Sequence, residues 1–174
     1  IPREKVSETG DTGRPLSEIV RQPKFLIAAV GGMIGYGVMS FIMTATPLAM
    51  IGCGLEFRDT AFVIQWHALG MFAPSFFTGS LINRFGVLRV MFVGALLLAE
   101  SVAVNLSGLE LMRFFSGLVL LGLGWNFLFI GGTTLLTETY EPAEKAKVQG
   151  LNDLLVFTTV SASSFASGAL LHLF

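Results

Sequence analysis

The chain has 174 residues, of which 53% are hydrophobic and 13% are charged, and its mean hydropathy is +0.72. This composition is too apolar for an ordinary soluble domain and indicates an integral membrane protein. A net charge of −1 argues against a nucleic-acid partner, and a single cysteine, Cys53, excludes an internal disulfide framework and a cysteine-built metal site.

The first predicted elements are a linker and a long spanning helix. Residues 1–24 are rich in charge, Gly and Pro, so we expect a solvated linker in which a short surface helix begins near Ser17. Residues 25–55 contain no Asp, Glu, Lys or Arg, and about 20 apolar residues are enough to cross the hydrocarbon core of a bilayer. We therefore predict the first span over about 25–52.

Two further apolar runs flank a short charged segment. After a polar break, runs over about 61–82 and 87–106 predict the second and third spans. The segment from Gly79 to Val90 reads GSLINRFGVLRV and carries two arginines, a small-residue start and an internal glycine. We expect it to form a tight charged loop between two helices of membrane length.

The remaining residues predict two more spans. A fourth span covers about 114–137, a polar loop follows at 138–150, and a fifth span runs from about 151 to 174. The predicted fold is therefore an all-α integral membrane bundle over 25–174. Because the chain begins without a signal peptide and ends inside an apolar run, we interpret it as part of a longer protein.

Basic residues are distributed unevenly between the two sides of this predicted bundle. By the positive-inside rule the side richer in Lys and Arg is cytoplasmic. That side comprises residues 1–24, 83–89 and 138–150. Its basic residues are Arg3, Lys5, Arg14, Arg21, Lys24, Arg84, Arg89, Lys145 and Lys147, whereas the opposite side has only Arg58 and Arg113.

The charged segment resembles the signature loop of the major facilitator superfamily, roughly G-x-L-x-D-R-x-G-R-R. Asn83 stands where the family has Asp. In the family, the fourth helix of each six-helix half is followed by the pattern E-x-x-x-P-x-x-(E)-R/K. The loop after the fourth predicted span resembles it through Glu138, Pro142, Glu144 and Lys145. The positions that match the signature loop are Gly79, Leu81, Arg84 and Gly86, and Arg89 supplies a basic residue one position after the basic pair of the pattern.

This resemblance implies a fold and a function. The fold is a six-helix half of a twelve-helix transporter, and the linker together with Asn83 favours the second half, helices seven to eleven. The implied partners are a small-molecule substrate, the lipid bilayer, the missing N-terminal half and a twelfth helix. We expect alternating access at the plasma membrane and proton-coupled export of an organic or amphipathic compound. A non-transporting membrane receptor or assembly protein on the same fold is the alternative.

Two spans carry candidates for a substrate cavity. Tyr36, Ser40, Met43 and Thr44 share roughly one face of the first span, and the resemblance implies that this helix lines the central path. In the fourth span, Trp125 could stack on a ligand or pack in the core. Asn126, beside it, needs a hydrogen-bond partner, either a substrate or a neighbouring helix.

Two carboxylates are candidates for different roles, Glu100 for proton coupling and Asp153 for conformational change. Glu100 lies in the middle of the third span, where a charge is costly, so it could carry the transported proton or simply reach water nearby. Asp153 at the predicted start of the fifth span could receive the signature loop of the other half or only cap its helix.

Other candidates concern conformational change and catalysis. The resemblance implies that the signature loop, with candidates Gly79, Asn83, Arg84, Gly86 and Arg89, holds the two halves together in one conformation. Arg84 and Arg89 could play this part, whereas Asn83 lacks the charge of the family's Asp and weakens the contact. We expect His67 to meet water near a membrane surface. No catalytic constellation is recognisable, so we predict no enzyme activity, no cofactor and no metal.

Overall fold

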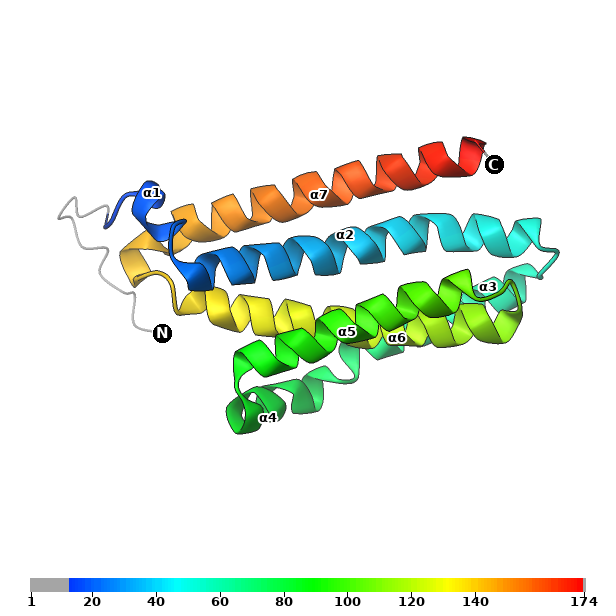
Figure 1. Cartoon of the computed structure of the whole chain (residues 1–174), viewed down its shortest axis with the longest axis horizontal. Coiled ribbons are helices and arrows are strands. Elements are labelled where there is room, and N and C mark those ends of the chain that lie inside the picture. The colour runs from blue at the N-terminus through cyan, green and yellow to red at the C-terminus, as the bar shows by residue number, and fades with distance from the viewer. Residues whose placement is uncertain (1–12, 174) are drawn as a thin grey trace, which may run out of the picture.

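The computed structural model describes residues 13–173, and every regular element within them is helical. Residues 1–12 of the predicted linker, and Phe174 at the end of the predicted fifth span, lie outside the described residues. The long helices run side by side (Figure 1). The elements are α1 (Leu16–Ile19), α2 (Pro23–Gly52), α3 (Phe57–Phe72), α4 (Ser75–Phe85), α5 (Val87–Leu106), α6 (Leu111–Thr137), η1 (Pro142–Glu144) and α7 (Lys145–Leu173).

Four helices in the described part of the chain are long and apolar enough to cross a membrane: α2, α5, α6 and the helix that continues from η1 through α7. The predicted second span is divided, because α3 ends at Phe72 and α4 begins at Ser75. Pro74 lies at this break. Proline has no backbone N–H to donate to the preceding turn, so it interrupts the helical hydrogen bonds. The stretch predicted as the second span, 61–82, therefore consists of two helices that meet at Pro74.

The charged segment is not an extended loop. Residues 79–85 belong to α4, α5 begins at Val87, and only Gly86 separates the two helices. Gly86 has φ of +88°, a backbone conformation that is costly for residues with a Cβ atom. A single glycine thus makes the whole turn, which is tighter than the sequence predicted.

Helix α6 forms the centre of the bundle. It contacts α2, α3 and α5, and its buried residues occupy most of its circumference. Glycines permit the closest approaches: a Cβ atom at Gly124 would lie 2.8 Å from the Gly94 carbonyl oxygen of α5. Helix α7 packs mainly on α2, and Figure 1 shows α2 between α7 and the α5–α6 pair. The side of α2 and α7 away from α6 therefore has little cover within the described residues.

The three segments predicted to share one side of the membrane lie toward the same end of the bundle. Figure 1 shows α1, the α4–α5 turn and the start of α7 at the left, opposite the α2–α3 and α5–α6 connections. The alternation of sides required by the charge pattern is thus present in the fold.

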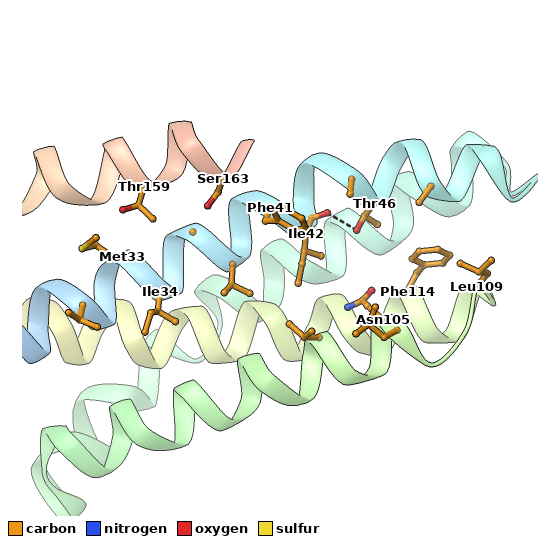
Figure 2. Close-up of a pocket in the computed structure, with 17 residues that line it drawn as sticks. Met33, Ile34, Phe41, Ile42, Thr46, Asn105, Leu109, Phe114, Thr159 and Ser163 are labelled. Atoms are coloured by element: carbon orange, nitrogen blue, oxygen red, sulfur yellow. Dashed lines mark hydrogen bonds between the residues drawn. The ribbon is translucent and has the colours of Figure 1, made fainter. Parts of the chain in front are cut away.

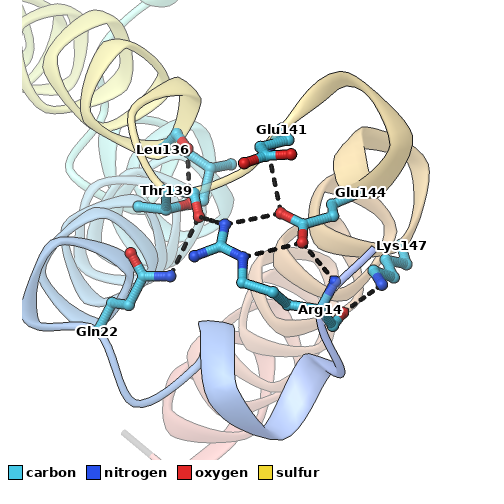
Figure 3. Close-up of polar contacts among 7 residues, drawn as sticks. All are labelled: Arg14, Gln22, Leu136, Thr139, Glu141, Glu144 and Lys147. Carbon is cyan, nitrogen blue, oxygen red and sulfur yellow. Dashed lines mark hydrogen bonds and ion pairs between the residues drawn. The ribbon is translucent and has the colours of Figure 1, made fainter. Parts of the chain in front are cut away.

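The described end of the linker is packed rather than solvated. The expected short helix is α1, but Ile19 in it is fully buried. Arg14 pairs with Glu144, whose side chain is 1% exposed, through Nη2–Oε2 at 2.7 Å and Nε–Oε1 at 2.9 Å (Figure 3). The Arg14 backbone N–H also donates to Glu144 Oε1, and Lys147 donates to the Arg14 carbonyl. This bonding raises the pKa of the Arg14 guanidinium and ties the linker to α7.

The start of the fifth span also differs from the prediction. Helix α7 begins at Lys145 rather than near residue 151. The turn η1 before it has Pro142 at its first position and a reciprocal capping box between Glu141 and Glu144. Proline and a capping box both favour the beginning of a helix, so the polar segment adds its last six residues to α7.

Candidate functional site

A cavity of about 280 Å³ lies between α2, α6 and α7, and we call it the α2–α6–α7 cavity. Its wall combines aromatic, polar and small side chains. The residues that line it are Ala28, Gly32, Tyr36, Leu128, Phe129, Gly132, Thr133, Leu136, Gln149, Asn152, Asp153, Val156 and Phe157.

Glycines bring the three walls of this cavity together. A Cβ atom at Gly32 of α2 would lie 3.3 Å from Val156 Cγ2 of α7, and one at Gly132 of α6 would lie 3.3 Å from the Ala28 carbonyl oxygen of α2. Both distances are tighter than most contacts of a real Cβ atom. The absence of side chains at these two positions therefore lets the helices converge and leaves the cavity unfilled.

One end of the cavity is aromatic. Phe129 stacks on Trp125 with ring centroids 4.8 Å apart and planes at 11°. Tyr36 meets both rings edge-on, at 5.2 Å from Trp125 and 5.9 Å from Phe129. Trp125 is 5% exposed and forms a buried layer behind Phe129, which is 39% exposed and lines the cavity. Trp125 thus packs in the core, and its stacked partner meets the cavity.

Sequence reasoning missed Phe129. The signal was available, because Phe129 follows Trp125 by four residues and therefore shares its helix face. Tyr36, predicted from α2, and Trp125, predicted from α6, do come together in the structure, with Phe129 as the third member of the cluster.

The other end of the cavity is polar and belongs to α7. Asp153 is exposed and lies eight residues after Lys145, so it cannot cap this helix as one interpretation of the sequence proposed. No hydrogen bond or ion pair with another residue of the range 13–173 engages its carboxylate. Asn152 and Gln149 lie beside it in the cavity wall, and sequence reasoning missed both.

The other three candidates on α2 do not line this cavity. Ser40 Oγ lies 2.7 Å from Ser164 Oγ of α7, and Thr44 donates to the Ser40 carbonyl oxygen within α2. Met43 packs against the hydrophobic core. The predicted shared face is therefore used for contact between helices, because α7 packs along it.

Asn126 also has a structural role. Its Nδ2 donates to the Met71 carbonyl oxygen at 2.6 Å and to Ser75 Oγ at 2.8 Å, and its Oδ1 accepts from Thr78 Oγ1 at 2.7 Å. The side chain is 1% exposed. Of the two partners that the sequence left open, the neighbouring helix is the one observed. Asn126 therefore joins α6 to the α3–α4 break and does not line the cavity.

The prediction that His67 meets water was wrong. His67 is 3% exposed, and its Nδ1 donates to the Leu118 carbonyl oxygen at 2.9 Å. Helix α3 is pressed against α6 at this point, so the imidazole is enclosed by protein.

Glu100 lies on an exposed face of α5, away from the α2–α6–α7 cavity. Exposed Phe92 and Leu96 precede it on α5, and Leu96 lies one helical turn away. Glu100 forms no ion pair with any residue in the described range. The structure does not bring this predicted coupling residue near Tyr36 or Asp153.

Five candidate residues of the charged segment at 79–90, which we call the signature segment, are exposed. They are Gly79, Asn83 and Arg84 of α4, the turn residue Gly86, and Arg89 in the first turn of α5. A Cβ atom at Gly79 would meet nothing within 4 Å. Arg84 lies over the Phe85 ring at 5.3 Å from its centroid. Residues 13–173 therefore supply no partner helix for this surface. Within the same range no group of His, Cys, Asp and Glu could hold a metal ion.

Curated relatives match the chain over most of its length. It is 49% identical over 162 residues to the riboflavin transporter RfnT of Brucella anthropi. It is 34% identical over 165 and 145 residues to two MFS-type transporters of Bacillus subtilis, YdeG and YddS. These matches cover 93%, 92% and 82% of the chain.

The chain belongs to the major facilitator superfamily. It spans only 41%, 38% and 33% of the length of these three relatives, which agrees with the prediction of one half of such a protein. No family model and no solved structure matches it significantly.

Membership of the superfamily confirms the predicted fold class, an all-α membrane bundle. The apolar helices and the relatives together indicate a multi-pass membrane protein. Because the relatives are transporters, the expectation that this chain is not an enzyme also holds.

Proposed function

We propose that this chain is the C-terminal half, helices seven to eleven, of a secondary active transporter that moves a small organic molecule by alternating access. The observation that carries the proposal is the α2–α6–α7 cavity, which joins an aromatic end to a polar end. In superfamily transporters the substrate site lies near the middle of the membrane between the two halves. A second half packed over this cavity would enclose it. The 49% identity to a riboflavin transporter nominates riboflavin as the first substrate to test.

A second and larger hollow supports the proposed architecture. An apolar groove of about 700 Å³ runs along α2 and is bordered by α5 and α7 (Figure 2). Phe41, Ile42 and Phe114 are among its lining residues. Its length and apolar lining suit a further membrane helix, and we propose the twelfth helix as its occupant. The groove would then be filled by the same protein and would not be the substrate site.

We also propose that transport is proton-coupled export across the plasma membrane, with residues 1–24, 83–89 and 138–150 on the cytoplasmic side. Glu100 supports the coupling, because a carboxylate inside a span is costly unless it pairs, meets water or takes up a proton. The basic residues gathered toward one end of the bundle support the orientation.

The test uses the complete transporter in sealed vesicles that carry a pH gradient. We expect riboflavin to cross the membrane only when the protein is present, and the gradient to be discharged as it does. Protein-free vesicles are the control. Movement of riboflavin without any effect of the gradient would overturn proton coupling but leave transport standing. No movement of riboflavin from correctly folded protein would overturn the nominated substrate.

The signature segment provides a separate prediction. Because a Cβ atom at Gly79 meets nothing within 4 Å in this chain, Gly79→Leu should leave the stability of this half unchanged. If the exposed α4 face closes against the other half, the same change should lower the transport rate by about tenfold, the effect of roughly 1.4 kcal/mol. Thermal unfolding and transport rate are measured on the same preparation. An unchanged rate would remove Gly79 from the conformational cycle.

A further inference from the structure

We infer that the α2–α6–α7 cavity binds two different parts of one substrate at its two ends. A planar aromatic ring rests against Phe129 and Tyr36, and a hydroxyl-bearing chain reaches Asp153. This inference rests on the proposed transport function and adds the chemical class of the substrate and its orientation.

The aromatic end is built to hold a flat ring. Phe129 is held by Trp125, which stacks behind it at 4.8 Å and is itself buried. Tyr36 stands nearly perpendicular to Phe129, with the two planes at 85°. A ring that enters the cavity therefore meets the free face of a fixed phenyl group and the side of a phenol. Offset stacking and edge-to-face contact are the two arrangements that aromatic pairs prefer.

The polar end has the chemistry to bind hydroxyl groups. The Asp153 carboxylate can accept hydrogen bonds, and no described residue donates one to it. Asn152 beside it can both donate and accept, and Thr133 contributes a hydroxyl from α6. A chain with several hydroxyl groups offers matching donors and acceptors. A purely apolar substrate would leave this carboxylate desolvated without compensation, which is costly.

The experiment separates the two ends with three probes on the complete transporter. Riboflavin has both a flat heteroaromatic ring and a polyol chain, lumichrome has the ring without the chain, and ribitol has the chain without the ring. We measure riboflavin uptake and its inhibition by lumichrome and by ribitol. Wild-type protein should be inhibited by lumichrome more strongly than by ribitol.

Two variants should both weaken riboflavin uptake but differ in their effect on inhibition by lumichrome. Phe129→Leu removes the ring contact, so the KM for riboflavin and the inhibition constant for lumichrome should both rise about 2- to 10-fold. Asp153→Asn removes the charged acceptor, so the KM for riboflavin should rise about 10-fold or more while lumichrome inhibition stays unchanged. Phe129→Tyr keeps the ring and should restore lumichrome inhibition.

Matched controls come from outside the cavity. Phe92→Leu changes an exposed phenylalanine of α5, and Glu18→Gln changes an exposed carboxylate of α1. Neither should alter any of the three measurements. The inference is overturned if riboflavin is transported but Phe129→Leu and Asp153→Asn affect lumichrome equally, or if neither affects riboflavin. Failure of wild-type protein to transport riboflavin or bind lumichrome would instead overturn the proposed substrate together with this inference.

Discussion

Gly122→Val is expected to prevent α3 from packing on α6. A Cβ atom at Gly122 would lie 2.6 Å from the His67 carbonyl oxygen, and 2.9 Å from both Gly70 C and Met71 N. These are backbone atoms of α3, so no side chain can rotate away and the two helices must separate. Overpacking typically costs about 1–3 kcal/mol, and we expect Gly122→Ala to fall at the top of that range and Gly122→Val to exceed it.

The measurement is recovery of monodisperse protein in detergent, followed by thermal unfolding of whatever is recovered. Gly150→Ala is the matched control, because Gly150 lies in α7 and a Cβ atom there would meet nothing within 4 Å. Alanine is a better helix former than glycine by about 0.5–1 kcal/mol, so this control should be neutral or slightly stabilising. Equal stability of the Gly122→Ala and Gly150→Ala proteins would show that the α3–α6 contact is not as tight as described.

Asn126→Leu is expected to loosen the α3–α4 break. The change removes the side-chain amide that bonds the Met71 carbonyl oxygen and Ser75 Oγ, and one of the two partners of Thr78 Oγ1, which also donates to the Pro74 carbonyl oxygen. An unsatisfied buried polar group costs about 1–3 kcal/mol, so a total loss of about 2–4 kcal/mol is reasonable after partial relaxation. No water in the hydrocarbon region could replace the amide.

Thermal unfolding gives the overall loss, and hydrogen exchange of residues 75–85 shows whether it is local. We expect faster exchange in α4 and little change in α2 or α7. Asn83→Leu is the control, since Asn83 is exposed on α4 and should change stability little. Uniform acceleration of exchange throughout the bundle would contradict the local role assigned to Asn126.

The positions of the helices predicted at about 25–52, 87–106 and 114–137 could be read from the sequence for a physical reason. Each segment of about 20 apolar residues is favoured in the membrane largely by its own composition, so its existence does not depend on its neighbours. The same is true of the uneven distribution of Lys and Arg, which acts on each connection separately. The first and third spans were predicted to within two residues of α2 and α5, and the superfamily followed from the residues of the signature segment.

Lateral packing decided the rest, because it depends on residues far apart in the chain. Whether the amide of Asn126 met a substrate or the α3–α4 break was settled by where α3 lies against α6. In the same way, Arg14 is held against the bundle only because η1 places the Glu144 carboxylate within ion-pair distance of its guanidinium. The cavity itself exists because glycines on separate helices let α2, α6 and α7 converge. Hydropathy specifies how many helices enter the membrane, whereas contact between helices specifies which side chains face one another.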